Sequence, residues 1–457
     1  MTPADNVLDY VDETFFLDFK AQSHGPPLIQ FTWVYEHEVD LGALQRFQSH
    51  LGNGLLGRCV ERSPLPFGRP RWVRWSPPGE LDVAPIARPR SEVAVWTDEQ
   101  AARPLDFEYG PPWRLAVQPL KEGGAAVTLV ATHGVADGMA LNMSVSDAVN
   151  GAPQDFRFPA ARSRTTLQAV LQDIRKTFHD LPSVLKAIVR TPLAARQLPG
   201  LARVRARGKA EVVRQDSHGQ ALAVHGERRV RLPSVTGFVD TRHWDERAES
   251  LKGTSNPLLL GVAARLCESL GWVDRDGMAC FMIPVNERTP GDTRGNALTA
   301  VQLIVDPSTV STDLTGIRAD VRSALATLSQ ARQQLLAPLP LTPFIPKILA
   351  RQLEGVVMKS ANLTVSHFGD LDPAVNRPDG TDAEWFSARH ARWSDGIDVD
   401  FLRRAGGVFF PIASGRLGGR IYISVCHANA AGSTTADDLR RALQGAFDDF
   451  GVSGTIV

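Results

Sequence analysis

Cysteine is scarce in this chain of 457 residues, which contains only four. Cys59, Cys267, Cys280 and Cys426 show no Cys-x-x-Cys spacing and stand in mostly apolar surroundings. This pattern favours buried thiols in a reducing compartment over a zinc site or a disulfide framework. We therefore expect no structural metal.

An excess of charge of either sign is absent as well. The 50 Lys and Arg residues balance 50 Asp and Glu residues, so no overall field recruits nucleic acid. No apolar stretch reaches the ~18 residues that cross a bilayer, and the segment that starts at Met1 lacks a basic part followed by an apolar one. We expect a cytoplasmic protein, or one peripheral to a membrane.

Two common catalytic motifs are also missing. No serine lies in Gly-x-Ser-x-Gly spacing, and the pair Gly123-Gly124 lacks the lysine and the length of a phosphate-binding loop. The sequence therefore disfavours covalent serine catalysis and nucleotide hydrolysis.

Strand-like and helix-like patterns recur in both halves of the chain, which predicts two similar α/β layers. The first half contains predicted strands over 28–35, 111–117 and 125–132 and a predicted helix over 40–47. The second half contains predicted helices over 256–270, 313–336 and 435–450 and predicted strands over 278–285, 295–304 and 419–425. We divide the chain into an N-terminal domain of residues 1–156, a connector of residues 157–229 and a C-terminal domain of residues 230–457.

The connector is strongly basic, since residues 157–231 hold 16 Lys and Arg against five Asp and Glu. Apolar residues recur at steps of four and three from Leu167 to Ile188, which predicts an amphipathic helix or a helix pair broken near Pro182. In one interpretation the helix packs on the body and leaves a solvated basic face. In the other, this segment docks an anionic partner such as a membrane, a carrier protein or a coenzyme A phosphate.

The hexapeptide His133-Gly134-Val135-Ala136-Asp137-Gly138 lies between a predicted strand and a predicted helix. An imidazole at a strand end can take a proton from a nucleophile near neutral pH. We expect Asp137, four residues after His133, to hold the turn in shape. The alternatives are a structural histidine, and a metal pair of His133 and Asp137 that lacks a third ligand.

This loop resembles the core of the His-His-x-x-x-Asp-Gly motif of chloramphenicol-acetyltransferase-like acyltransferases. That superfamily includes peptide condensation domains, polyketide-associated acyltransferases and bacterial wax ester synthase/diacylglycerol acyltransferases. Further elements resemble the wax ester synthase group, in chain order: 111–114 (Pro-Pro-Trp-Arg), 253–257 (Gly-Thr-Ser-Asn-Pro), 284–288 (Pro-Val-Asn-Glu-Arg), Gly295-Asn296 and 365–369 (Val-Ser-His-Phe-Gly). The sequence departs from the pattern at Thr132, Pro257 and His367, where the first His, an Asp and an Asn are usual.

The resemblance implies an α/β fold of two chloramphenicol-acetyltransferase-like domains in a V-shaped arrangement around a central tunnel. It also implies an acyltransferase that moves an acyl group from a thioester to a hydroxyl acceptor, with His133 as general base and a backbone N–H near Gly138 facing the oxyanion. In this arrangement Asp137 braces the loop by pairing with a cation, for which Arg288 is the candidate. The candidate substrate-binding residues are Trp113, Asn286, Asn362 and Ser366, each of which can also be interpreted as a core, turn or strand residue.

The donor implied by the resemblance is acyl-CoA or the phosphopantetheine thioester of an acyl carrier protein, which acts as a co-substrate, so we expect no permanently bound cofactor. The acceptor is an alcohol or an amine. A second hypothesis is a free-standing condensation enzyme that forms an amide or ester between carrier-bound substrates. A third, prompted by Thr132, is a degenerate binding module without catalytic activity. Peripheral membrane contact through the basic segment 157–231 is a further expectation.

Overall fold

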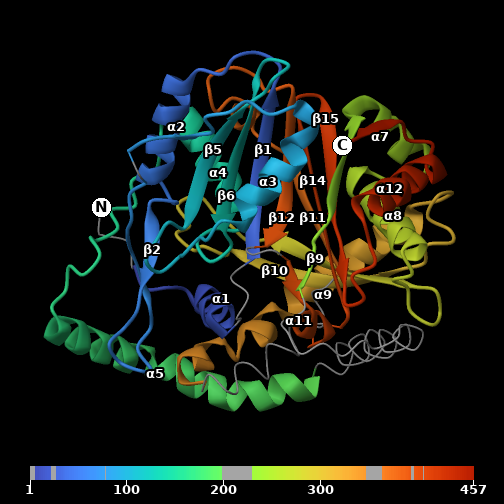
Figure 1. Ribbon diagram of the computed structural model, residues 1–457. Helices are drawn as coiled ribbons and strands as arrows, with labels where there is room; N and C mark the ends of the chain where they lie inside the picture. The colour runs from blue at the N-terminus through green and yellow to red at the C-terminus, as the bar shows by residue number, and fades with distance from the viewer. Residues whose placement is uncertain are drawn as a thin grey trace.

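The computed structural model describes residues 6–21, 27–77, 79–197, 229–345, 363–392, 396–404 and 406–457. Within these ranges the chain forms two lobes, each built on one main β-sheet with helices packed against it (Figure 1). This is the mixed α/β fold that the sequence predicted. The central tunnel and the domain boundaries at residues 156 and 229 stay predictions.

The first lobe contains a five-stranded sheet in the order β12-β1-β6-β5-β4. Its central strand β6 (Ala125–Thr132) is buried along its whole length because helices cover both faces of the sheet. On one face, Phe31 and Trp33 of β1 (Pro27–Tyr35) pack with α2 (Leu41–Asn53) and α4 (Gly138–Val149); α3 (Val93–Ala102) covers the other face. The other elements are α1 (Tyr10–Ala21), β2 (Arg58–Glu61), β3 (Arg71–Arg74), β4 (Asp82–Val83), η1 (Arg90–Glu92) and β5 (Trp113–Pro119).

One strand of this sheet comes from the far end of the chain. The strand β12 (Trp385–Arg392) pairs antiparallel with β1, with Phe386 opposite Trp33 and Arg392 opposite Pro27. The ring of Phe386 also packs edge-on against Tyr422 of the second lobe, with 5.5 Å between the ring centroids. By sequence β12 belongs to the second half, but by hydrogen bonding it belongs to the first lobe, so it ties the two lobes together.

The second lobe is built on a sheet in the order β10-β9-β11-β14-β15-β8-β17, with β16 paired to β14. The apolar residues of α7 (Thr241–Ser250), α8 (Ser255–Ser269) and α12 (Ala436–Asp449) form one core with this sheet. The other elements are β7 (Arg229–Val230), β8 (Ser234–Asp240), β9 (Ala279–Asn286), β10 (Leu298–Val305), α9 (Thr315–Leu336), η3 (Leu339–Phe344), β11 (Leu363–Asp370), η4 (Pro373–Asn376), β13 (Ile397–Asp398), α11 (Val399–Arg404), β14 (Val408–Leu417), β15 (Arg420–Cys426), β16 (Ala428–Asn429) and β17 (Gly454–Ile456).

The basic connector contains one long helix, α5 (Thr166–Gln197), which runs along the lower edge of the molecule in Figure 1. The predicted break near Pro182 is therefore wrong. A proline removes one backbone donor and leaves the carbonyl four residues earlier, that of Phe178, without its helical partner. Both Pro182 and Phe178 are exposed, so water can satisfy this carbonyl and the helix continues.

Three properties of the described ranges bear on the expectations from composition. None of their helices combines the length and the apolar character that crossing a bilayer requires. Nowhere in these ranges do three His, Cys, Asp or Glu side chains gather in a way that could hold a metal ion. Cys59, Cys267 and Cys426 are buried free thiols, as expected, whereas Cys280 is only partly buried.

Candidate active site

The loop from His133 to Gly138 is a strand-to-helix turn at the end of β6. The backbone N–H of His133 donates to the carbonyl of Pro27 at 2.9 Å, which fixes the loop to the start of β1. The loop then turns tightly, because the N–H of Val135 donates to the carbonyl of Thr132 at 3.1 Å. Asp137 ends the turn as the N-cap of α4, and its Oδ1 accepts a hydrogen bond from the N–H of Ala140 at 2.7 Å.

The side chain of His133 contacts a residue from the second half of the chain. Its Nδ1 lies 2.7 Å from Oδ1 of Asn296. The amide of Asn296 has a defined orientation, because its Nδ2 donates to the carbonyl of His133 and to Oδ1 of Asp12, both at 3.1 Å. Since Oδ1 of Asn296 can only accept, Nδ1 of His133 must carry the proton. Nε2 of the neutral ring then carries the lone pair, which is the state of a general base.

Asn296 is held in turn by a carboxylate from α1. Asp12 accepts hydrogen bonds from the backbone N–H of Gly295 at 2.8 Å and of Asn296 at 2.7 Å. Burial raises the pKa of Asp12 to about 6, although the nearby Arg58 charge and these N–H donors oppose the increase. A hydrogen-bonded series therefore runs from the Asp12 carboxylate through the Asn296 amide to the His133 imidazole. Its three residues come from distant segments of the chain.

Burial is also the main cause that lowers the pKa of His133. The negative charge of Asp137 and the hydrogen bond to Asn296 act in the opposite direction. Because the ordinary pKa of histidine is already below 7, a further decrease keeps the ring neutral at neutral pH.

The expected contact between Asp137 and Arg288 is present. Nη2 of Arg288 lies 2.9 Å from Oδ2 of Asp137, and the two side chains are only 2% and 4% exposed. The same Oδ2 accepts the N–H of Ala297 at 2.8 Å, and Arg288 also donates to the carbonyl of Gly295 at 3.0 Å. An ion pair this deeply buried, with these additional hydrogen bonds, fixes the relative position of the loop and the 295–297 segment.

A second buried cation, Arg58, also supports the His133 loop. Sequence reasoning did not single it out. Arg58 of β2 donates to the carbonyl of Val135 at 2.8 Å and also to the carbonyl of Thr293. Its guanidinium lies over the ring of Trp72, 3.8 Å from the centroid. Burial lowers the pKa of Arg58 to about 9, while the charge of Asp12 opposes the decrease. At neutral pH Arg58 is therefore still a cation that joins both lobes.

The other residues predicted for the site are more dispersed. Trp113 is buried in the first lobe, where its Nε1 donates to the carbonyl of Leu56 at 2.9 Å, a core role. Asn286 lies at the exposed end of β9 and accepts the N–H of Arg288 at 3.0 Å. Ser366 is a buried residue of β11, and Asn362 lies outside the described residues. Asn296 is a residue whose side chain bonds to the ring of His133.

Gly138 opens α4 against a strand of the second lobe. A Cβ on Gly138 would lie 2.2 Å from Cε1 of Phe368 in β11, so only glycine fits beneath this ring. The backbone N–H groups of the first turn have no acceptor within the helix and carry the positive end of its dipole. The expectation that this end of α4 stabilises an oxyanion stays a prediction.

Sequence reasoning missed a second histidine near His133. His390 lies near the end of β12, opposite Ile29, and Ile29 lies opposite Ala131 of β6. Burial, followed by the charges of His133 and Arg392, lowers the pKa of His390 to about 3. Its Nε2 is shielded from solvent and has no hydrogen-bond partner among the described residues. No local motif marks His390, because only the pairing of β12 with β1 brings it there.

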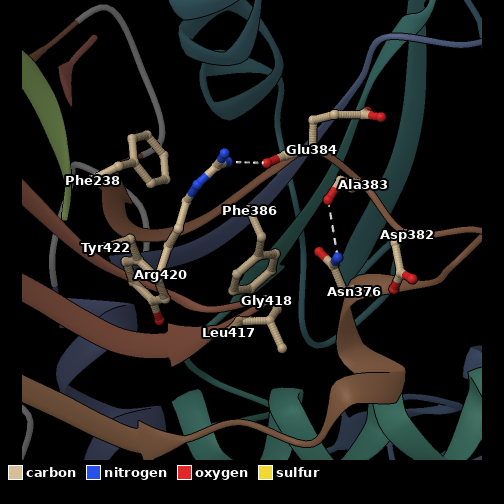
Figure 2. A pocket seen from close by; sticks show the side chains of 10 residues that line it. All are labelled: Phe238, Asn376, Asp382, Ala383, Glu384, Phe386, Leu417, Gly418, Arg420 and Tyr422. Carbon is tan, nitrogen blue, oxygen red and sulfur yellow. Dashed lines mark hydrogen bonds between the residues drawn. The ribbon is translucent and has the colours of Figure 1, made fainter. Parts of the chain in front are cut away.

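A separate cavity of about 410 Å³ opens between the lobes at the other end of β12. Figure 2 shows Phe386 and Tyr422 on its wall, with Arg420 donating to the carbonyl of Glu384. Phe386 pairs with Trp33, whereas His133 is bonded to Pro27, so the two sites lie near opposite ends of β1. At ~3.3 Å per residue this separation is roughly 20 Å, and the cavity is distinct from the site at His133.

Comparison with known proteins identifies the fold. Neither a protein-family profile nor a curated protein matches the sequence. Solved structures do match over nearly the whole chain. Polyketide synthase associated protein 5 from Mycobacterium tuberculosis is 16% identical, with a TM-score of 0.53 and 96% of both chains covered. The first condensation domain of the calcium-dependent antibiotic synthetase is 15% identical, with a TM-score of 0.56 and 98% of this chain and 99% of that chain covered.

The wax ester synthase/diacylglycerol acyltransferase from Marinobacter aquaeolei VT8 is 12% identical, with a TM-score of 0.55 and 98% of this chain and 100% of that chain covered. The chain therefore has the chloramphenicol-acetyltransferase-like fold that condensation domains and wax ester synthases share, with two such domains in a V-shaped arrangement. The resemblance indicated by the His133 loop is confirmed at the level of the fold.

Proposed function

We propose that this protein is an acyltransferase that moves an acyl group from a thioester to a hydroxyl acceptor. The observation that carries the proposal is the hydrogen bond from Nδ1 of His133 to Asn296, which leaves the Nε2 lone pair as the basic position. A general base needs one ring nitrogen without a proton, and this hydrogen bond supports that state at Nε2.

The chemistry needs few further groups, because a thioester is already activated. Nε2 of His133 takes the proton of the acceptor hydroxyl while the hydroxyl oxygen attacks the thioester carbonyl. The tetrahedral oxyanion is stabilised by the N–H groups at the start of α4, near Gly138. When the intermediate collapses, the C–S bond breaks and the proton on Nε2 passes to the departing thiolate. The products are the ester and the free thiol, and His133 is neutral again.

The donor in this proposal is acyl-CoA or an acyl carrier protein thioester, and the acceptor is an alcohol. The second candidate is a condensation reaction between carrier-bound substrates, with an amine or alcohol as acceptor. It is supported by the fold shared with a condensation domain over 98% of this chain. The proposed membrane contact of segment 157–231 does not depend on this chemistry, because it rests on α5 alone.

The test is to incubate purified protein with acyl-CoA and a long-chain alcohol and to measure ester and free thiol. We expect turnover that His133→Ala abolishes and that His37→Ala, at the far end of β1, preserves. Transfer that survives His133→Ala would overturn the base assignment. Turnover with an acyl carrier protein but none with acyl-CoA would favour the condensation reaction. Binding of acyl-CoA without turnover of either donor would favour the non-catalytic binding module.

A further inference from the structure

The helix α5 is attached to the body through polar contacts and through a few smaller apolar side chains, among them Val184. Asp173 accepts hydrogen bonds from Ser63 at 2.5 Å and from Arg164 at 2.7 Å. Asp180, two turns further on, accepts from Arg69 at 3.0 Å. Because these contacts recur at helical spacing, the face of α5 that carries Asp173 and Asp180 is turned to the body.

The large apolar side chains of α5 lie on the opposite side and face outward. Phe178 is 71% exposed and Leu167 is 68% exposed, whereas buried Ala169 and Ala187 share the inner face with the two aspartates. The outer row has steps of four and three and consists of Leu167, Leu171, Ile174, Phe178, Leu181, Leu185 and Ile188. We call these seven residues the α5 stripe. At 1.5 Å per residue it is roughly 32 Å long.

An exposed apolar row of this length needs an explanation, because monomeric proteins seldom leave one in water. The first interpretation of the connector, a helix packed on the body with a solvated basic face, agrees with the contacts of Asp173 and Asp180 but does not account for the exposed α5 stripe. The body covers Ala169, Val184 and Ala187 but leaves the larger apolar residues of the stripe exposed.

The charges beside the stripe indicate what covers it. Arg175, His179, Lys186 and Arg190 are all exposed, and at 100° per residue they follow one flank of the stripe. The only acidic residues of α5 are Asp173 and Asp180, and both face the body. The outward half of the helix is therefore apolar and cationic, without an acidic group.

A second copy of the chain fits this surface less well than a lipid surface. The spacing of the stripe would suit a coiled coil, in which acidic and basic residues beside the seam pair between helices. Here the flank supplies only cations, so two copies would bring like charges together. A bilayer with anionic headgroups matches both features, because it takes up apolar side chains and attracts basic ones.

We propose that the α5 stripe and its basic flank bind the protein peripherally to an anionic lipid surface. In this arrangement the helix lies in the plane of the interface, with its acidic face still bonded to the body. The proposal does not depend on acyl transfer, since none of these residues belongs to the His133 site.

The test is co-sedimentation with vesicles of phosphatidylcholine alone or mixed with phosphatidylglycerol. We expect binding to the mixed vesicles that increasing salt weakens. The triple variant Leu171→Ser/Phe178→Ser/Leu185→Ser should lose it. The variant Arg175→Gln/Lys186→Gln/Arg190→Gln should bind roughly a hundredfold more weakly, because each basic residue near an anionic surface contributes about fivefold. The matched control is Ile86→Ser, a residue 74% exposed outside α5, which should bind like the wild type.

Several results would overturn the proposal. These are absence of binding to the mixed vesicles, equal binding to phosphatidylcholine alone, or unchanged binding of the triple serine variant. Light scattering that shows a dimer, converted to a monomer by that same variant, would assign the stripe to a second copy instead. Since all substituted residues are exposed, circular dichroism should show every variant folded.

Discussion

Replacing Asn296 with leucine is the most direct test of how the second lobe prepares His133. The substitution keeps a similar side-chain size but removes the acceptor that lies 2.7 Å from Nδ1. A buried neutral hydrogen bond contributes about 1 kcal/mol, so the preference for the Nδ1–H tautomer should weaken by about fivefold. In Asn296→Leu we expect the limiting rate of acyl transfer to fall by up to this factor, about fivefold.

The pH dependence of the acyl-transfer rate should change in a direction that a merely structural role of Asn296 would not produce. The bond to Asn296 raises the pKa of His133, against the larger effect of burial. Its loss should lower this pKa further. A general base is active when neutral and loses activity as the pH falls through its pKa. The variant should therefore be slower at neutral pH yet keep its own maximal rate down to a more acidic pH than the wild type.

Two measurements check this expectation. The first is the pH profile of kcat/KM, and the second is the titration of the His133 ring by NMR, which needs no substrate. Asn286→Leu is the matched control, since Asn286 contacts Arg288 but not the imidazole. The reasoning is refuted if Asn296→Leu leaves the rate and the acidic limb unchanged, or if Asn286→Leu shifts the limb equally.

Three further predictions concern stability. Arg288→Met leaves the buried Asp137 carboxylate without its cation and should cost roughly 3 to 5 kcal/mol in urea unfolding, part of which Asp137→Asn restores in the double variant. Gly138→Ala should lose about 1 to 3 kcal/mol through the clash with Phe368, and Phe368→Ala in the same chain should recover some of it in thermal melts. Burial raises the pKa of Glu13 from 4.5 to about 7, so the folded protein holds this proton more tightly than the unfolded chain. The free energy of unfolding should therefore fall as the pH rises from 4.5 through 7, and Glu13→Gln should reduce this fall.

The parts of the site that lie close together in sequence could be predicted. The run from Ala125 to Gly138 contains a strand, a turn and a capped helix start, and the structure has β6, the turn and α4 at those positions. Arg288 could be named as the partner of Asp137 only through the resemblance to a superfamily, because no spacing rule joins residues that are 151 positions apart.

The remaining contacts depend on pairing between distant segments. Asp12 reaches Asn296 only because α1 packs beside the 295–297 segment, and His390 approaches His133 only because β12 crosses into the first sheet. A polar residue in a strand or a short helix carries no local signal of such a partner. The exposure of the apolar face of α5 could not be predicted either, since apolar periodicity predicts a helix but not which side of it the body covers.

Thr132, which replaces the first histidine of the superfamily motif, raised the question of whether the site is degenerate. Successive residues of a strand point to opposite faces, so Thr132 shares the side of β6 that packs against α3, whereas Ala131 faces α4. Thr132 is fully buried, and its Oγ1 accepts the N–H of Gly134 at 3.2 Å. Its hydroxyl therefore shapes the turn that presents the next residue, and the series of Asp12, Asn296 and His133 does not include it. The hydrogen bonds that orient His133 do not involve position 132, so Thr132 is compatible with the proposed acyltransferase and does not by itself favour a non-catalytic binding module.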